Sequence, residues 1–392
     1  MNILKKINFI VKSIPRLTIR LVFDVSCILF RVKEDKVTFA SCRFNQMTGN
    51  LHFVYKELVK KKPDYEYVFL LRKHNPGFFN TILTFFGMLK ASYHLATSRY
   101  FVIDDYYFPI YVVKPRKPTE VIQLWHAAGA LKKFGHSIIG KKYGASHEYV
   151  KRVPIHSNYS KVIVSSKEVI PFFSEAFNIP KDNIYPLGIP RIDYFHMHDE
   201  HIELKKRFYM RYPTLKSKKI VLYAPTFREG KRNLSTFKYP FNVPQLKKEI
   251  GEEYAVLVHF HPYTTNEAKQ KASGFLYVAD ETFCIEELLI MADVLITDYS
   301  SIIFDYSTLE RPMAFFADDL EDYIQERDFY YDYEQVIPGP ILSGTAELVS
   351  FLKEDNFDLQ KIKEFRQTFF DDREPNVTSR IVNQLFQIDN DE

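Results

Sequence analysis

Two series of short apolar segments, each alternating with stretches of helical character, constrain the fold of this 392-residue chain more than any other feature. The first series comprises residues 37–41, 67–71, 100–103, 121–124, 161–165 and 184–188, and the second comprises 219–223, 255–259, 276–278, 294–297 and 313–316. Strands that alternate with helices form parallel sheets. The pattern therefore predicts two α/β domains of similar size, joined by a helix and linker over 199–219.

The first 36 residues differ in character from the rest of the chain. Eight lysines and arginines are interspersed there with apolar residues, and only three acidic residues oppose them. No apolar run approaches the ~20 residues that span a bilayer, and no signal-peptide cleavage site follows. The segment predicts either a helix lying in the interface of an anionic membrane leaflet or an amphipathic helix packed on the domain. A second apolar stretch, 78–96, predicts a core helix or a further membrane-facing element.

Composition narrows the classes of function. A net charge of +4 is too small for a general nucleic-acid-binding surface. The three cysteines have neither metal-ligand spacing nor the even count of a disulfide framework, which fits a reducing cytosol. Neither a Walker A sequence nor G-x-G-x-x-G occurs, so P-loop phosphoryl transfer and dinucleotide redox chemistry lack their usual motifs. We expect no cofactor and no metal.

His126 follows directly on the apolar run 121–124, within V-I-Q-L-W-H-A-A-G-A-L-K-K-F-G. Ligands of open parallel sheets bind outside the carboxyl ends of the strands, which is where this imidazole is expected. Imidazole titrates near pH ~6.5 and can accept a proton at neutral pH. Gly129 allows backbone N–H groups to approach a ligand, and Lys132 and Lys133 add positive charge. The segment predicts an anion site with a candidate base, although a histidine after a strand is also commonly structural.

The first two strands of the second series end in residues that can contact an anion. Thr226 and Arg228 follow the first, and a guanidinium there can hold phosphate with two hydrogen bonds or simply be a surface arginine. His259 and His261 follow the second and lie on the same side of an extended segment. Because no carboxylate or cysteine partner stands at a recognisable spacing, anion contact or acid–base work is favoured over metal binding.

A serine-rich turn follows the predicted strand 294–297. Ser300 and Ser301 precede the apolar segment Ile302-Ile303-Phe304, which reads as the start of a helix. Free N–H groups and the dipole at such a start attract phosphate, and the two hydroxyls can add hydrogen bonds. The alternative is ordinary helix capping by Asp298 or Ser300, without any ligand.

Five segments together resemble the CDP-glycerol glycerophosphotransferases of wall teichoic acid biosynthesis in Gram-positive bacteria: W-H-A-A-G-A-L-K-K-F-G at 125–135, G-I-P-R-I-D at 188–193, Y-A-P-T-F-R at 223–228, H-P-Y at 261–263 and T-D-Y-S-S-I-I-F-D at 297–305. The resemblance covers about 37–340 and is of the primase or short-chain type by length. It implies a GT-B-like fold, with two Rossmann-like domains facing across a cleft. The implied divisions are a membrane-associating segment 1–36, an acceptor domain 37–205, a nucleotide-donor domain 206–350 and C-terminal helices 351–392 that return to the first domain.

The resemblance also implies an activity. Glycerol phosphate would pass from CDP-glycerol to a lipid-linked glycerol-phosphate acceptor at the cytoplasmic face of the cell membrane, with release of CMP. The implied catalytic residues are His126, the preferred base, and His261, which contacts the transferring phosphate or protonates the leaving group; exchange of these two roles is the alternative. The implied donor-binding residues are Gly129, Thr226, Arg228, Thr297, Ser300, Ser301 and Asp305. Arg191 is either structural or a phosphate contact.

Three alternatives stay open. A ribitol-phosphate donor is compatible with the same motifs, and His259 stands where related sequences frequently have arginine, so the donor contact there is in doubt. A GT-B nucleotide-sugar glycosyltransferase or epimerase would release UDP or a sugar isomer in place of CMP. A non-catalytic membrane scaffold would leave His126, His261 and the serine turn without a role.

Overall fold

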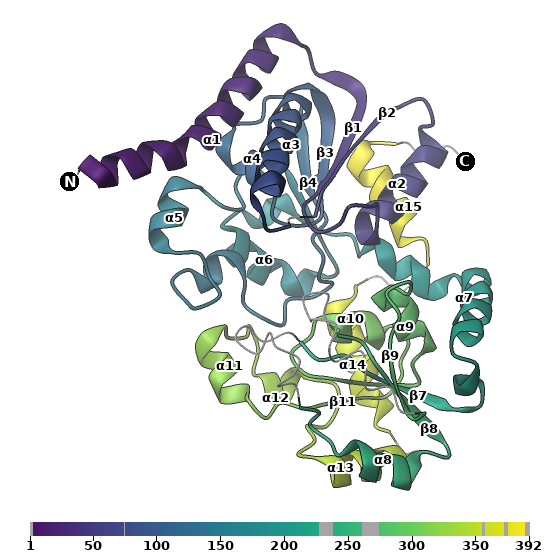
Figure 1. Cartoon of the computed structure of the whole chain (residues 1–392). Helices are drawn as coiled ribbons and strands as arrows, with labels where there is room; N and C mark the ends of the chain where they lie inside the picture. The colour runs from purple at the N-terminus through teal and green to yellow at the C-terminus, as the bar shows by residue number, and fades with distance from the viewer. Residues whose placement is uncertain are drawn as a thin grey trace. The chain divides into compact units, whose positions relative to one another are not determined.

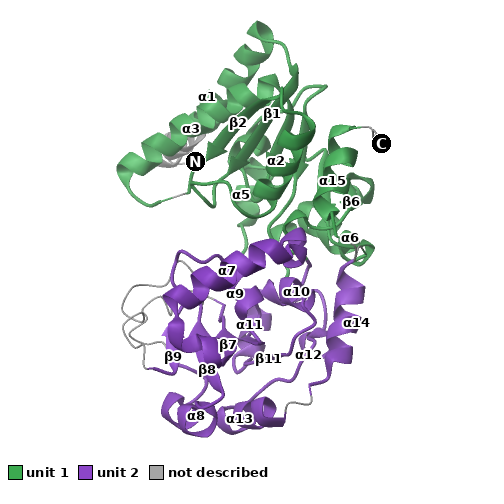
Figure 2. Cartoon of the chain, turned by 90° about the vertical axis from the view of Figure 1, so that its right-hand side faces the viewer, with its two compact units in different colours: residues 1–128, 133–191, 371–392 green, residues 129–132, 192–370 purple. Residues whose placement is uncertain are grey.

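The structure is a computed structural model that describes residues 3–73, 75–226, 238–260, 274–354, 357–371 and 375–388, with only the backbone described for 3–13 (Figure 1). The chain forms two compact units (Figure 2). Unit 1 contains Met1–Ala128, Lys133–Arg191 and Asp371–Glu392, and unit 2 contains Gly129–Lys132 and Ile192–Phe370.

Unit 1 is built on a six-stranded sheet whose described pairings are all parallel. Its strands are β1 (Lys33–Ser41), β2 (Glu66–Leu71), β3 (Ser98–Ile103), β4 (Glu120–Gln123), β5 (Lys161–Val164) and β6 (Ile184–Pro186), in the order β2-β1-β3-β4-β5-β6. The central strands β3 and β4 are almost wholly buried, as expected for a parallel sheet covered on both faces.

Helices cover this sheet. They are α1 (Ile3–Leu29), α2 (Gly49–Lys61), α3 (Phe78–Thr97), α4 (Phe108–Val112), α5 (His147–Arg152), α6 (Ile170–Phe177) and α15 (Val377–Phe386), with 3-10 turns at Gly135–Ile138, Lys167–Val169 and Lys181–Asn183. α15 lies against α2, far from it in sequence (Figure 1). Ile381 and Leu385 of α15 join Leu51 and Val54 of α2 in one buried cluster. The last described helix thus completes the core of the unit that begins the chain.

Unit 2 contains a five-stranded sheet of the same kind. Its strands are β7 (Lys219–Tyr223), β8 (Tyr254–Val258), β9 (Leu276–Val278), β10 (Val294–Thr297) and β11 (Met313–Phe315), in the order β11-β10-β7-β8-β9. Its helices are α7 (His198–Arg211), α8 (Val243–Ile250), α9 (Ile285–Met291), α10 (Ile302–Ser307), α11 (Leu320–Glu326), α12 (Tyr333–Val336), α13 (Thr345–Glu354) and α14 (Leu359–Phe369), with a 3-10 turn at Pro213–Ser217. A further 3-10 turn, Pro190–His196, begins in unit 1 and ends in unit 2.

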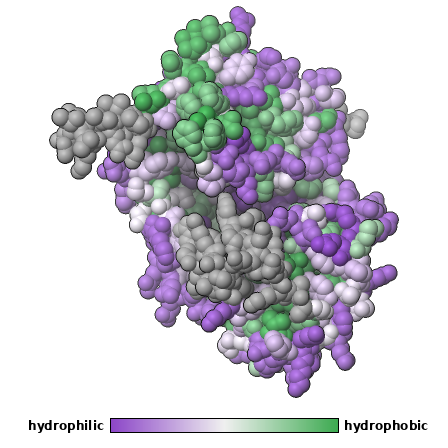
Figure 3. All heavy atoms as spheres, viewed as in Figure 1, coloured by the Kyte–Doolittle hydropathy of each residue, from purple (hydrophilic) through white to green (hydrophobic). Residues whose placement is uncertain are grey.

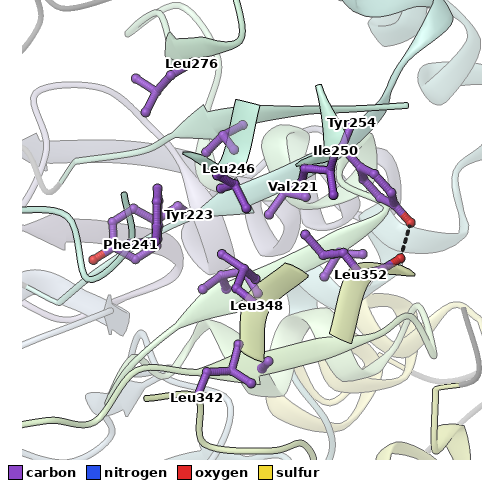
Figure 4. Close-up of a cluster of buried hydrophobic side chains, with 14 of the residues drawn as sticks. Val221, Tyr223, Phe241, Leu246, Ile250, Tyr254, Leu276, Leu342, Leu348 and Leu352 are labelled. Atoms are coloured by element: carbon purple, nitrogen blue, oxygen red, sulfur yellow. Dashed lines mark hydrogen bonds between the residues drawn. The ribbon is translucent and has the colours of Figure 1, made fainter. Parts of the chain in front are cut away.

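A buried cluster joins β7 and β8 to α8 and α13 on one face of this sheet (Figure 4). Val221 and Leu246 lie in it, and the hydroxyl of Tyr254 donates to the carbonyl oxygen of Leu352 at 3.1 Å. This hydrogen bond offsets the cost of removing the tyrosine hydroxyl from water.

All eleven predicted strands are present, with ends that differ by a few residues. β1 starts at Lys33, earlier than the predicted 37. No helix in the described part of the chain combines the length and the apolarity needed to cross a bilayer.

Candidate active site

The strand orders locate a switch point in each sheet, where successive strands are added on opposite sides. In unit 1 this point lies between β1 and β3, and in unit 2 between β7 and β10. Ligands of open α/β sheets bind beyond the carboxyl ends of the strands at such points.

At the edge of unit 1, three side chains from three neighbouring strands converge. Arg43 follows β1, Asp105 follows β3 and His126 follows β4. The Arg43 guanidinium lies 3.1 Å from Oδ2 of Asp105, and Nδ1 of His126 lies 3.7 Å from the same oxygen. The other carboxylate oxygen, Oδ1, accepts the N–H of Tyr106 at 2.7 Å. The result is a carboxylate held between a permanent cation and a candidate base.

His126 is neutral at neutral pH in this setting. Burial of the ring lowers the pKa of His126 to about 3; the Asp105 carboxylate opposes this, and the charges of Arg43 and Arg191 reinforce it. About a third of the side chain (34%) is nevertheless exposed, whereas Nδ1 is buried. The exposed part is therefore elsewhere on the ring, and Nε2 is the nitrogen able to meet a ligand.

Arg43, and not His126, is the counter-ion of Asp105. Burial alone would raise the pKa of Asp105, but the charges of His126 and Arg43 and the N–H of Tyr106 lower it below its usual value. Because His126 is neutral, the lasting contribution comes from Arg43. The adjacent Asp104 behaves differently, since burial raises its pKa to about 6.

The backbone that carries His126 is strained and held by buried amides. Trp125 has a φ of 53°, a left-handed conformation that is rare for a bulky residue and clusters at functional sites. Gln123 accepts the Trp125 N–H at 2.9 Å and donates to the Asp105 carbonyl oxygen at 3.0 Å. Asn50, from the first turn of α2, donates to the Trp125 carbonyl oxygen at 2.9 Å. These bonds fix the direction in which the imidazole leaves the strand.

The G-I-P-R-I-D segment joins the same framework. The side-chain oxygen of Asn50 accepts the N–H of Arg191 at 3.2 Å, and Arg191 is buried close enough to lower the pKa of His126. Gly188 has a φ of 94°, and a Cβ there would come within 2.5 Å of Val377 in α15. Arg191 is thus positioned by the backbone beside the candidate base.

At the edge of unit 2, Asp298 ties the ends of β7 and β10 together. Its carboxylate accepts the N–H of Thr226 at 2.9 and 3.0 Å and also the Thr226 hydroxyl. The Thr297 hydroxyl is fully buried and donates to the Ala224 carbonyl oxygen at 2.7 Å. Both threonines thus hold the two loops in register at the switch point.

Ser300 and Ser301 lie where the sequence places them, at the start of α10. Both are partly exposed, and the Ser300 hydroxyl accepts the N–H of Ile302 at 3.4 Å. The residue that precedes α10 is Ser301, whose side chain makes no capping bond, and the Asp298 carboxylate binds Thr226. Asp305 is buried on the inner side of α10.

Gly129 is required by packing inside unit 2. A Cβ at this position would lie 2.3 Å from the ring of Phe304, far inside contact distance. The sequence predicts close approach of a ligand at this glycine, whereas the structure shows close approach of an aromatic ring.

Two predicted residues, Arg228 and His261, lie outside the described residues. His259 is described: its N–H donates to the Tyr223 carbonyl oxygen at 2.9 Å, and burial lowers its pKa, with Glu286 opposing.

Sequence reasoning missed Arg43, Asp105 and Asn50. The signal for the first two was the one that identified His126, a polar residue directly after an apolar run, but it was not applied to 37–41 and 100–103. Asn50 gave no local signal, because its role depends on contacts with segments 74 and 141 residues away.

Comparison with known proteins gives consistent matches. The profile of CDP-Glycerol:Poly(glycerophosphate) glycerophosphotransferase matches residues 21–387. The chain is 43% identical to the teichoic acid ribitol-phosphate primase of Bacillus spizizenii, over 90% of this chain and 91% of that protein. It is 38% identical to the teichoic acid poly(ribitol-phosphate) polymerase of the same organism, over 97% of this chain and 61% of that longer protein. The wall teichoic acid polymerase TagF shares the fold, with a TM-score of 0.76 and 21% identity, over 99% of this chain and 98% of the TagF chain.

Proposed function

Because the chain belongs to the CDP-glycerol:poly(glycerophosphate) glycerophosphotransferase family, whose members here are teichoic acid primases and polymerases, we propose that it transfers ribitol phosphate from CDP-ribitol to a lipid-linked teichoic acid acceptor. The supporting observation for the donor is the 43% and 38% identity to two ribitol-phosphate enzymes. CDP-glycerol, the donor implied by the sequence resemblance, is the second candidate, because the matching family profile is that of a glycerophosphotransferase.

The proposed reaction is a displacement at phosphorus. The acceptor hydroxyl attacks the β-phosphorus of the donor, a new P–O bond forms, and the bond to the bridging oxygen breaks to release CMP. The proton of the acceptor hydroxyl passes to His126. Such reactions depend on positioning and charge stabilisation. A neutral imidazole at the carboxyl end of β4, one strand from the switch point of unit 1, carries this assignment, because only an unprotonated ring can act as a base.

The proposal assigns the donor to the edge of unit 2. Ser300 and Ser301 are the candidate phosphate contacts, because both are partly exposed beside the start of α10. Thr226, Thr297 and Asp305 act as supports, since the two hydroxyls are engaged within unit 2 and Asp305 is buried. Arg228 and His261 keep the roles that the resemblance implies, as donor contact and phosphate contact.

A donor assay tests this proposal. The purified protein is incubated with CDP-ribitol or CDP-glycerol and a synthetic lipid-linked acceptor, and CMP release is followed together with acceptor mass. We expect CMP with CDP-ribitol, and one added unit for a primase or a ladder for a polymerase. Turnover only with CDP-glycerol would correct the donor. No CMP release with either donor, or full activity of His126→Gln, would contradict the proposed reaction.

We also propose that unit 1 binds the cytoplasmic membrane surface through α1 and α3. α1 has two apolar stripes: Ile19 and Phe23 are buried against unit 1, whereas Leu17, Leu21 and Ile28 are exposed. Together with Val25, which is also exposed, this stripe follows the spacing of three and four residues that marks one face of a helix. A helix packed on its domain and a helix facing a membrane are therefore compatible descriptions of α1.

The beginning of α3 extends this apolar surface. Phe78, Phe79 and Phe86 are exposed there, and α3 packs on α1. Apolar side chains gather on this part of the molecule in Figure 3. Exposed clusters of this kind mark interaction surfaces, and exposed basic residues of the same segment, such as Arg31, favour an anionic leaflet.

Vesicle co-sedimentation tests the membrane proposal. Replacing Leu21 and Ile28 by glutamine should weaken binding to anionic vesicles about tenfold or more, because each buried leucine or isoleucine side chain contributes about 1.5–3 kcal/mol. Met210→Gln is the matched control, because Met210 is 83% exposed but lies in unit 2. Binding that is unchanged by the double substitution would contradict this surface.

A further inference from the structure

One oxygen of Asp105 is shared by two partners, which gives this carboxylate a more specific part than that of a counter-ion. Oδ1 is occupied by the N–H of Tyr106, so Oδ2 alone faces both Arg43 and His126. The Asp105 side chain is 22% exposed, and its carbonyl oxygen is held by Gln123. Asp105 is thus held at both carboxylate oxygens and at its backbone carbonyl oxygen.

Nδ1 of His126 is a buried nitrogen without a hydrogen-bond partner in the described part of the chain. Its distance of 3.7 Å from Oδ2 of Asp105 is too long for a hydrogen bond. Buried polar atoms are nearly always paired, and hydrogen bonds at active sites are often long until substrate binds. A shift of less than about 1 Å would bring this pair to bonding distance.

We propose that Asp105 is a positioning residue for His126: it accepts a hydrogen bond from Nδ1–H and so leaves Nε2 unprotonated to take the proton of the acceptor hydroxyl. This inference deepens the proposed function and rests on it. Neutral imidazole carries its proton on one nitrogen only, and the partner of that nitrogen decides which one. Nε2 is also the nitrogen that can reach a ligand, since Nδ1 is buried.

Arg43 contributes by keeping Asp105 ionised. Its guanidinium contacts Oδ2 at 3.1 Å, and an ionised carboxylate can only accept hydrogen bonds. A protonated Asp105 could donate to Nδ1 and would select the wrong tautomer. The backbone carbonyl of Asp104 is the competing acceptor near the His126 ring. A hydrogen bond from the ring to this carbonyl is the alternative to a hydrogen bond from Nδ1–H to Asp105.

The tautomer of His126 provides a test that needs no substrate. The full-length chain, labelled with ring-¹⁵N histidine, is examined by NMR at neutral pH, and the His126 signals are identified from their loss in His126→Gln. We expect the Nδ1–H tautomer in the wild type and a change towards Nε2–H in Asp105→Asn, whose amide can donate to Nδ1. An Nε2–H tautomer in the wild type, or no change in Asp105→Asn, would overturn the proposal.

Kinetics give the second readout. Asp105→Asn should lower kcat about 100-fold or more, in the range expected for loss of a positioned base, with KM for the donor nearly unchanged. Glu148→Gln is the matched control, because it also removes a carboxylate paired with an arginine in unit 1 but lies on the exposed helix α5. An unchanged kcat in Asp105→Asn would overturn the proposal.

The two proposals can fail separately. If no CDP-alditol supports turnover in the wild type, the proposed function fails, while the NMR result still decides whether Asp105 sets the tautomer. If Asp105→Asn does not fold, the wild-type tautomer still tests the assignment. The tautomer of His126 in Arg43→Lys, which retains a cation beside Asp105, should then match that of the wild type.

Discussion

Three ionisable residues at the edge of unit 1 have pKa values that differ from those of the free amino acids. His126 is neutral, Asp105 is ionised, and Asp104 has a raised pKa because its carboxyl group is buried. One oxygen of Asp104, Oδ1, is buried without a hydrogen-bond partner among the described residues. At the scale of single residues, the chemistry therefore depends on burial as much as on residue type.

The raised pKa of Asp104 makes the stability of the protein depend on pH in a defined direction. Its folded-state pKa of about 6 exceeds the ordinary value of 3.8, so its contribution to stability is fully present below pH 3.8 and is lost as the pH rises through 6. Asp104→Asn does not titrate. As the pH rises from 4.5 to 8, we expect the free energy of unfolding of the variant, compared with that of the wild type, to increase by about 1–3 kcal/mol.

Urea unfolding at the two pH values measures this difference. Glu148→Gln, which removes an exposed carboxylate, should show no comparable change. A free-energy difference between Asp104→Asn and the wild type that is the same at both pH values would contradict a raised pKa of Asp104.

Asn50 lets the role of backbone positioning be tested separately from charge. Asn50→Ala removes the donor to the Trp125 carbonyl oxygen and the acceptor of the Arg191 N–H. Each buried group left unpaired costs about 1–3 kcal/mol, so we expect lower stability together with lower kcat. Thermal unfolding and the CMP assay measure the two effects. Loss of stability with unchanged kcat would show that Asn50 does not position His126.

The sequence predicted the site residues that have a local signal, and it missed those whose role depends on segments far away along the chain. His126, Ser300 and Ser301 directly follow apolar strands, and they lie at the strand ends as expected. Arg43 and Asp105 matter because β1, β3 and β4 are neighbours in the sheet, and strand order is not visible in the spacing of residues. The strained conformation of Trp125 could not be predicted either, because it depends on the buried amides of Asn50 and Gln123.

At the scale of elements, every predicted strand was found, because strands buried on both faces appear as continuous apolar runs. The short helices α4 and α12 were not predicted, since four or five residues carry no helical periodicity. The start of α10 shows a further limit. Asp298 resembled a capping residue, but the structure assigns its carboxylate to Thr226 on another loop.

The contact between Gly129 and α10 predicts the cost of adding one methyl group. Gly129→Ala would place a Cβ against Phe304, which is itself packed on Phe365 and Phe369 of α14. Overpacking of this kind typically costs about 1–3 kcal/mol. Gly274→Ala is the control, because nothing lies within 4 Å of its added Cβ. If both variants unfold at the same temperature as the wild type, the close packing at Gly129 is not tight.

At the scale of the whole molecule, unit 1 is assembled from segments at opposite ends of the described chain. α15 covers the sheet together with α2, and the loop after α14 adds a bond from the Lys167 N–H to the Asp371 carboxylate. The chain contains one tryptophan, Trp125, and it lies in unit 1. Tryptophan fluorescence therefore reports the state of unit 1 alone.

This arrangement predicts that substitutions in α15 lower the stability of unit 1. Ile381→Ala and Leu385→Ala each remove a fully buried side chain and should cost about 2–5 kcal/mol. The loss should appear as an earlier fluorescence transition of Trp125 in urea. Leu352→Ala, an equally buried leucine in the core of unit 2, is the control that should leave that transition in place if the units unfold independently.

The path of the chain through unit 1 also sets an order of events during synthesis. Most domains can fold as soon as they leave the ribosome, and the N-terminal one usually folds first. Here α2 and the face of β1, β3 and β4 beside it stay uncovered until α15 has been translated, after all of unit 2. Unit 2 is therefore the first part able to reach its native core, and a nascent chain that stops before residue 377 exposes an apolar surface that chaperones and proteases recognise.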